Sequence, residues 1–375
     1  MNIEVLQKNL SKGLNISSRF VSTRSQLPIL GNILLKASGN KLLLCATNLE
    51  VSSTITLGAK VENEGEIAVP AKTITDIVSN LSTDTVSLFS EKEILRIKGQ
   101  NFVSRISGVN SSDFPHIPIS IGQKAIKIPA QTLANSLSKV VFAASSDETR
   151  PLLTGDLLIV KKHNVVLVAT DGFRLSQVKI KTDSATDGTQ KVILPKAVLV
   201  EVMKSAPDEG NIAFSFRKKD SQAVFALPGM IFSSRIMEGE FPNYERIIPK
   251  DAKLKVVIDK EDLLRAVKLC SVIARDSANV IKLVIKEKEV NLLSESKKSG
   301  KQDVKIEANT QGDSTLIKKN GFCIAFNYRF LENFLTAVGG AEIEMQFSAT
   351  NSPGVFIDPN ETNFLHLIMP VKIEE

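Results

Sequence analysis

Residues 126–137 read IKIPAQTLANSL, and this stretch decides the fold because it joins two different periodicities. Ile126 and Ile128 are separated by one residue, which is typical of a short strand with one buried face. Leu133 and Leu137 follow at a spacing of four, which places both side chains on one face of a helix. The stretch therefore predicts a short strand that leads directly into an amphipathic helix.

The same strand-and-helix pattern occurs at two other places in the chain. Residues 3–14 read IEVLQKNLSKGL and residues 256–267 read VVIDKEDLLRAV. In the first of these we expect Leu6, Leu10 and Leu14 to form the apolar stripe of the helix. The matching leucines are Leu10, Leu133 and Leu263, which are 123 and 130 residues apart. A repeat of this length is the size of a domain, so the sequence predicts one module built three times.

A second feature repeats with nearly the same spacing. Each module contains another amphipathic run that begins close to a basic residue, at Lys72, Lys196 and Arg329, which are 124 and 133 residues apart. Pro70 and Pro195 precede the first two runs, and a proline there is a helix-start signal. The two motifs shift together along the chain, so they belong to one repeating unit.

The domain boundaries follow from a third motif. The first two modules close with Phe-Pro sequences at residues 114–115 and 241–242, where proline interrupts secondary structure. We expect domains at residues 1–121, 122–249 and 250–375. Short alternating segments bounded by turn residues fill the rest of each module. The fold class is therefore α+β, with two helices packed on about eight antiparallel strands in each domain.

Composition excludes several classes of protein. The 375 residues are 43% hydrophobic and 23% charged, which is ordinary for folded domains. No run of about 18 apolar residues could span a membrane, and residues 1–4 do not begin a secretory signal. Three distant cysteines form neither a disulfide framework nor a zinc motif. We expect a cytoplasmic protein.

The sequence offers no catalytic motif. Its three histidines lack a partner at metal-ligand spacing, and neither a phosphate-binding glycine loop nor a nucleophile elbow is present. We expect no enzyme activity, no metal and no cofactor. The alternative is a hydrolase or transferase whose site is assembled between domains, where two titratable groups with shifted pKa values would converge.

The basic residues favour contact with phosphate. The net charge is +6, and the three domains carry +2, +4 and 0. A cation at the start of a helix opposes the helix dipole, so its threefold recurrence points to a role other than stability. Candidate phosphate contacts on the first helix of each module are Lys12, Lys139 and Arg265. The alternative is that these residues only solvate helix faces. Few aromatic residues argue against base stacking, and no recognition helix favours a sequence-specific DNA regulator.

At this point the chain resembles a known family, the bacterial sliding clamps that form the beta subunit of DNA polymerase III. The resemblance covers all three modules. The motifs that carry it are LPILGN at residues 27–32, ATDGFRL at 169–175, FPNY at 241–244 and MPV at 369–371. In this order, along three repeats, they are specific for the family.

The resemblance implies a closed ring made by two copies joined head to tail. Helices would line a central hole around duplex DNA, and sheets would form the outer wall. The ring would hold a replicative polymerase on DNA without sequence preference or catalysis. Implied partners are duplex DNA, a second copy, the polymerase III alpha subunit, a clamp loader, other DNA polymerases, a ligase and mismatch-repair proteins.

The resemblance also implies three sets of site residues. Its DNA contacts match Arg24 and Arg150, together with Lys72 and Lys196, and Arg329 is added by repeat symmetry. The dimer contact matches Val272 and Ile273, while the partner strand near residues 102–109 stays unassigned. A pocket for short partner peptides between the second and third domains matches Leu153, Thr170, Gly172, Phe173, Arg174, Leu175, Pro242, Arg246, Ile247, Leu367, Met369, Pro370 and Val371.

Overall fold

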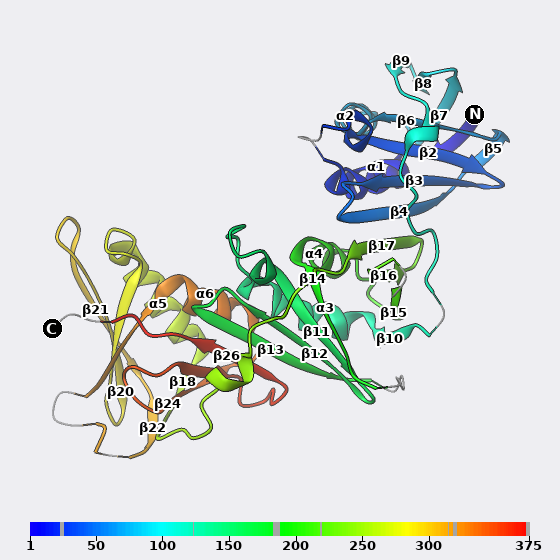
Figure 1. Cartoon of the computed structure of the whole chain (residues 1–375). Helices are drawn as coiled ribbons and strands as arrows, with labels where there is room; N and C mark the ends of the chain where they lie inside the picture. The colour runs from blue at the N-terminus through cyan, green and yellow to red at the C-terminus, as the bar shows by residue number, and fades with distance from the viewer. Residues whose placement is uncertain are drawn as a thin grey trace. The chain divides into compact units, whose positions relative to one another are not determined.

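The structure is a computed structural model that describes residues 1–22, 26–122, 124–182, 188–217, 220–313, 315–317 and 321–372. The chain forms two compact units (Figure 1). Unit 1 contains residues 1–131 and 197–236, and unit 2 contains residues 132–196 and 237–375. No helix among the described residues is long and apolar enough to cross a membrane.

The repeated strand-and-helix pattern is present in all three modules. The strands are β1 (Asn2–Leu6), β10 (Ile126–Pro129) and β18 (Leu254–Asp259), and the helices that follow are α1 (Gln7–Ser17), α3 (Ala130–Ser138) and α5 (Lys260–Ala274). The marker residues Leu10, Leu133 and Leu263 are all buried. The prediction of Leu6 as part of the apolar stripe of the first helix was wrong. Leu6 ends β1 and is 52% exposed, because the helix begins only at the next residue.

A second helix follows a strand in each module, as the sequence predicts. The strands are β6 (Gly65–Pro70), β14 (Gln190–Pro195) and β23 (Phe322–Asn327), and the helices are α2 (Ala71–Ser79), α4 (Lys196–Lys204) and α6 (Tyr328–Ala337). The side chain of Asn327 accepts a hydrogen bond from the backbone of Arg329 at 3.0 Å and so caps α6. Within the units, α1 packs beside α2 and α5 beside α6.

Unit 1 contains two antiparallel sheets. The first has the order β5-β1-β7-β8-β9 and the second has the order β10-β15-β16-β17-β4-β3-β2-β6. The further strands are β2 (Asn32–Ser38), β3 (Lys41–Thr47), β4 (Val51–Gly58), β5 (Lys60–Asn63), β7 (Thr85–Glu91), β8 (Ile94–Gly99), β9 (Phe102–Ser107), β15 (Asn211–Arg217), β16 (Gln222–Leu227) and β17 (Met230–Arg235).

Unit 2 also contains two antiparallel sheets. Their orders are β14-β11-β12-β13-β26-β25-β24-β18-β22 and β21-β20-β19-β23. The further strands are β11 (Gly155–Lys161), β12 (Asn164–Thr170), β13 (Arg174–Lys181), β19 (Val280–Ile285), β20 (Glu289–Ser296), β21 (Gly300–Glu307), β22 (Asn309–Gly312), β24 (Glu342–Phe347), β25 (Gly354–Ile357) and β26 (Phe364–Ile368).

The compact units differ from the three sequence modules because the sheets run across module boundaries. In unit 1 a backbone ladder joins β4 of the first module to β17 of the second. In unit 2 another ladder joins β13 of the second module to β26 of the third. Each long sheet therefore combines parts of two modules. The boundaries near residues 121 and 249 stay a prediction.

The Phe-Pro segments that close the first two modules pack against the sheets. Phe114 packs on Cys45 and Ala68 in unit 1, and Tyr244 packs on the sheet core of unit 2. The remaining short helices are η1 (Ser18–Phe20), η2 (Pro28–Gly31), η3 (Ser111–Asp113), η4 (Val141–Ala143), η5 (Pro151–Thr154) and η6 (Tyr244–Ile247). The linkers are therefore ordered parts of each unit.

The burial of Leu10 and the exposure of Leu6 give a matched pair of substitutions. Leu10→Ala is expected to cost about 2–5 kcal/mol, because it leaves a cavity beneath α1. Leu6→Ala is expected to change the free energy of unfolding by less than about 1 kcal/mol, because its side chain is half in water. Urea unfolding followed by circular dichroism measures both. Equal effects of the two substitutions would contradict this packing.

Candidate functional site

A tight turn between β12 and β13 organises the candidate peptide pocket. The hydroxyl of Thr170 donates a hydrogen bond to the carbonyl of Arg174 at 2.5 Å and accepts one from the backbone of Gly172 at 3.0 Å. A carboxylate oxygen of Asp171 accepts from the backbone of Phe173 at 2.9 Å and of Arg174 at 3.0 Å. Gly172 has φ of +92°, a conformation that favours glycine. The motif TDGFR is thus a self-capped turn.

The side chain of Arg174 is used inside unit 2. Its guanidinium donates to Asp171 at 3.1 Å, to Asn333 on α6 at 2.6 Å and to the carbonyl of Phe142 at 2.6 Å. It also lies over the rings of Phe142 and Phe330, 5.4 and 4.6 Å from their centroids. Burial lowers the pKa of this arginine. These contacts tie the turn to α6, and the predicted contact of Arg174 with a peptide stays a prediction.

Exposed apolar side chains surround this turn. The backbone of Met369 donates to the carbonyl of Phe173 at 2.8 Å, which places the segment after β26 beside the turn. Phe173, Ile247, Met369 and Val371 are all exposed large hydrophobic residues. Four such residues from the predicted set offer an apolar surface for a partner.

Two residues of the predicted peptide pocket lie below the surface. Leu175 and Leu367 face each other across β13 and β26 and are buried in one core cluster with Tyr244. They can support a pocket floor but cannot meet a peptide without rearrangement. Residues 241–248 pack on the same cluster, which brings the linker to this side of unit 2.

The remaining predicted pocket residues line the linker and the neighbouring loops. Leu153 in η5 and Pro370 are half-buried, whereas Pro242 and Arg246 are exposed. Among the described residues Arg246 has no ion-pair partner. It is therefore free to meet a charged or polar group of a peptide.

Arg150, predicted to contact DNA, lies beside the peptide turn. Its guanidinium pairs with Asp147 at 3.0 Å and donates to the carbonyl of Asp171 at 3.1 Å. A Cβ added at Gly172 would lie 3.2 Å from this guanidinium. The loop around residue 150 and the TDGFR turn are thus one structural feature, which sequence spacing alone does not reveal.

Four of the candidate phosphate contacts are exposed on helices. Lys12 lies on α1, Lys72 near the start of α2, Arg265 on α5 and Arg329 near the start of α6. Lys72 also lines a hollow of about 560 Å³ with residues 27 and 28. Arg265 pairs with Asp262 at 3.2 Å, an exposed contact of small energetic value. Arg24 lies outside the described residues.

Lys139 is not a free cation. Its ammonium binds the carboxylate of Glu361, and its side chain is only 13% exposed. The ring of Phe364 lies 5.9 Å from the same ammonium. This ion pair joins the end of α3 to the segment before β26, and the contact of Lys139 with DNA stays a prediction.

Lys196 differs from its counterparts Lys72 and Arg329 in its surroundings. Burial lowers its pKa, while the charge of Asp156 opposes this effect. Asp156 on β11 is 1% exposed, and neither of its carboxylate oxygens has a hydrogen-bond partner among the described residues. Burial raises the pKa of Asp156 to about 7, and the charge of Lys196 reduces that rise. Asp156 could not be identified from the sequence, because no local motif distinguishes this carboxyl from others.

A second buried ionisable group lies in the same sheet of unit 2. His366 on β26 shares a hydrogen bond with the hydroxyl of Ser176 at 2.8 Å, between the rings of Phe142 and Phe334. Burial lowers its pKa to about 3, with a smaller contribution from the charge of Arg174. The imidazole is neutral at pH 7 and acts as a packed ring.

The candidate dimer contact lies on α5. Val272 is 62% exposed and Ile273 is half-buried, so the first of them has no packing role inside the unit. Leu269, three residues earlier, is also exposed and was not identified from the sequence. Residues three apart share a helix face, so Leu269 and Val272 form one apolar patch.

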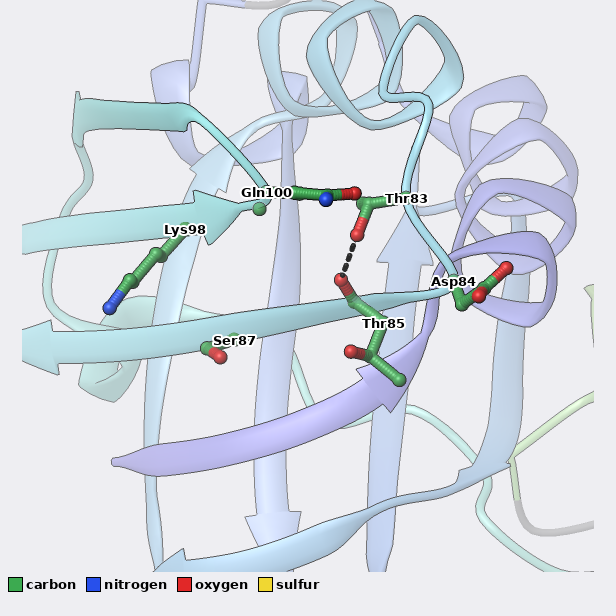
Figure 2. A pocket seen from close by; sticks show the side chains of 7 residues that line it. Thr83, Asp84, Thr85, Ser87, Lys98 and Gln100 are labelled. Carbon is green, nitrogen blue, oxygen red and sulfur yellow. Dashed lines mark hydrogen bonds between the residues drawn. The ribbon is translucent and has the colours of Figure 1, made fainter.

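A polar hollow in unit 1 was considered as a catalytic centre. It has a volume of about 380 Å³ and is lined by residues 83–85, 87 and 98–100. Figure 2 shows that Asp84 and Lys98 point away from each other, and that the Thr83 hydroxyl bonds the Thr85 carbonyl at 2.9 Å. Two converging titratable groups, which the enzyme alternative needs, are not found in this hollow.

Comparison with known proteins gives one consistent family. Models of the DNA polymerase III beta subunit match the chain over residues 1–118 for the N-terminal domain, 127–243 for the central domain and 245–372 for the C-terminal domain. A beta sliding clamp from Synechocystis is 30% identical and one from Bacillus subtilis is 28% identical. The alignments cover 100% and 99% of this chain, and 100% of each relative.

Solved structures agree with the sequence comparison. The DNA polymerase III beta subunit of Thermotoga maritima superposes with a TM-score of 0.89 at 27% identity. The DNA polymerase sliding clamp of Bacillus subtilis superposes with a TM-score of 0.92 at 26% identity. Each comparison covers 100% of both chains. The similarity therefore extends over the whole fold.

The buried carboxyl of Asp156 predicts an unusual pH dependence. Its folded pKa of about 7 lies above the unfolded value, so the folded chain binds the extra proton between about pH 4 and 7. Stability from this group is full at low pH and falls as the pH rises through 7. Asp156→Asn should therefore be more stable than the parent at pH 8, by roughly 3–4 kcal/mol at most, and equal to it near pH 4.

Urea unfolding between pH 4 and 8.5 measures this difference. His366 has the opposite sign, because its lowered pKa destabilises the folded chain as the pH falls through 6.5. The two slopes partly cancel in the parent, so only the difference between variant and parent is informative. Asp220→Asn, at an exposed position, is the matched control. Parallel pH profiles for Asp156→Asn and its parent would rule out the raised pKa.

Proposed function

The chain belongs to the family of DNA polymerase III beta subunits, and from this premise we propose that two copies close into a ring around duplex DNA. The protein is a sliding clamp for DNA polymerase III, a non-catalytic subunit. The ring would give the polymerase processivity by enclosure, and it would recruit other partners through the peptide pocket. A closed ring can slide because it needs no contact with base edges.

One observation carries the ring: two sheet edges are open that are closed elsewhere in the same chain. β4 and β13 are the equivalent strands of the first two modules, and each pairs with the last strand of the next module. The equivalent strand of the third module is β21, and the last strand of the first module is β9. Both are edge strands. Unpaired edges of this kind bind another strand readily, so a second copy would close both.

Head-to-tail pairing then follows from the order of the modules. β21 of one copy would meet β9 of the other, and the reverse contact would close the ring. Val272 and Ile273 on α5 would lie beside this joint, as the resemblance implies. The two copies would contribute six modules, with helices toward the DNA and sheets outward.

Contact with DNA would use exposed cations on these helices. Lys12, Lys72, Arg265 and Arg329 are the candidates that remain exposed. Such contacts are electrostatic and weaken with salt, and they carry no sequence preference. Lys196 is half-buried, so it would take part only if its side chain extends to the surface. The role of Arg150 is shared with the peptide turn, and that of Arg24 stays a prediction.

Partner proteins would bind at the apolar surface around Phe173. Ile247, Met369 and Val371 would receive apolar side chains of a short peptide, and Arg246 would meet its polar groups. The proposed partners are the polymerase III alpha subunit, a clamp loader, other DNA polymerases, a ligase and mismatch-repair proteins. These partners place the protein in the bacterial cytoplasm.

The topological mechanism makes a sharp prediction. After assembly by a clamp loader on nicked circular DNA, the protein should stay bound in moderate salt and leave once the circle is cut. Gel filtration of labelled protein with DNA measures retention. Linear DNA with ends blocked by bulky bound proteins is the control and should restore retention. Equal retention on open linear DNA would contradict enclosure.

The peptide surface predicts a selective loss of partner binding. Ile247→Asp should weaken binding of a C-terminal peptide of a bacterial polymerase III alpha subunit by at least tenfold, because a charge would replace an apolar contact. Phe89→Asp, at a similarly exposed apolar residue on β7 of unit 1, is the matched control and should leave affinity unchanged. Fluorescence anisotropy measures both. Equal affinities for the two variants would refute the assignment.

A further inference from the structure

Two joints inside the chain connect the sheets of neighbouring modules: the ladder β4–β17 in unit 1 and the ladder β13–β26 in unit 2. The strands at both joints pair in the same register. In unit 1, Phe232 lies opposite Ser53, and in unit 2, His366 lies opposite Ser176. Phe232 and His366 are each the third residue of their strands, β17 and β26. The third residue of β9 is Ser104. Repeat equivalence therefore identifies Ser104 as the residue that occupies this position at the joint between copies.

The residue of β21 that would lie opposite Ser104 can be found by comparing the hairpins that come before each joint. The first residues of β3, β12 and β20 lie opposite the last residues of the next strands, which are Gly58, Lys181 and Glu307. Ser53 and Ser176 each lie five residues before that strand end. The same count from Glu307 gives Gln302. Antiparallel pairing of Ser104 with Gln302 then sets Arg105 opposite Lys301.

Helix contacts at the internal joints agree with this alignment. Phe20 stacks on Phe232 with centroids 5.2 Å apart, and Phe142 packs on His366 at 5.4 Å. These two phenylalanines lie ten and nine residues after the marker leucines Leu10 and Leu133. The residues ten and nine positions after the third marker leucine, Leu263, are Ile273 and Val272. The exposed side chain of Val272 is therefore expected to cover Ser104 of the second copy.

The chemistry at the neighbouring position differs sharply among the three joints. In unit 1 the hydroxyls of Ser52 and Ser233 share a hydrogen bond of 2.6 Å. In unit 2 the equivalent residues are Leu175 and Leu367, which are buried against each other. Between copies the equivalent residues are Lys301 and Arg105, two cations. At this position a hydrogen bond holds the first joint and apolar burial holds the second. The third joint would bring two positive charges together.

Neighbouring charges do not remove this repulsion. Arg105 lies opposite Arg96 on β8 of its own sheet, and no ion pair involves either within the described residues. Lys301 forms an ion pair with Glu295 on β20 at 2.7 Å. The row of residues across the joint would therefore contain one carboxylate, that of Glu295, and three basic side chains. In the adjacent row Lys98 pairs with Val103, which would face Asp303 of the second copy.

We propose that the joint between copies is a like-charge seam, in which Arg105 of one copy lies directly opposite Lys301 of the other. This inference rests on the proposed ring and fixes its strand register and weakest contact. Like charges directly opposite each other destabilise a strand pair. The seam, unlike the internal joints, is therefore held by the backbone ladder and the α5 patch against an electrostatic penalty.

Cysteine cross-linking tests the register. Under mild oxidation the variant with Arg105→Cys and Lys301→Cys should form a covalent dimer, because directly opposite residues come within disulfide distance. The variant with Arg105→Cys and Asp303→Cys, shifted by two residues, is the matched control and should not. Each single variant reports any reaction with the native cysteines. Cross-linking of the shifted pair instead would overturn the register while leaving the ring intact.

Charge reversal tests the seam itself. Arg105→Glu should tighten the dimer several-fold, because glutamate would face Lys301, and adding Lys301→Glu should cancel that gain. Added salt should tighten the parent dimer through screening. Lys162→Glu, an exposed turn position with the same charge change, is the control and should have no effect. Analytical ultracentrifugation gives the dissociation constants.

The outcomes separate the seam from the ring. Weaker dimers for Arg105→Glu, together with a parent dimer that loosens in salt, would overturn the like-charge seam and leave the ring standing. A parent chain that stays monomeric at micromolar concentration in every salt, and forms no cross-link in either cysteine pair, would overturn the ring itself. A cross-link in the expected pair and a tighter Arg105→Glu dimer support both.

Discussion

Backbone hydrogen bonds between strands at the edges of the sheets join the modules of this molecule. Each module ends in a strand that can extend the sheet of its neighbour, and the chain uses this property twice. The ladders β4–β17 and β13–β26 consume two pairs of edges. The counterparts of these strands at the two ends of the repeat, β9 and β21, lie at sheet edges. The proposed assembly would therefore follow from the number of repeats.

The same continuity explains the position of the peptide turn. The turn at residues 170–174 closes the β12–β13 hairpin at the edge where the third module joins. Arg174 spans that joint, since it bonds to Asp171 on one side and to Asn333 on α6 on the other. A buried arginine is costly unless its donors are satisfied, and here a carboxylate, an amide and a carbonyl satisfy them. The joint therefore holds the turn in place, which suits the proposed role of Phe173 and Met369 in binding a partner.

Much of the fold was readable from the sequence because the repeat supplies three independent copies of each signal. The strand leads, the marker leucines and the basic helix starts occur at matching positions and fold as predicted. The prediction for Leu6 was wrong because the spacing of apolar residues does not show where a strand ends and a helix begins. The sheets that cross module boundaries were not visible from the residues, since backbone pairing leaves no mark on side-chain spacing. The site was less readable for a related reason. Only coordinates show that Glu361 neutralises Lys139, or that Arg174 is fully engaged.

The basic residues at the starts of the second helices, one in each module, differ in their burial. Lys72 and Arg329 are exposed, whereas Lys196 is half-buried close to Asp156. A carboxyl buried without hydrogen bonds favours its neutral form, but a nearby ammonium favours the charged form. Burial lowers the pKa of Lys196, and the charge of Asp156 opposes this effect. The second module thus holds its cation half-buried beside the sheet, while the other two modules present theirs directly at the surface.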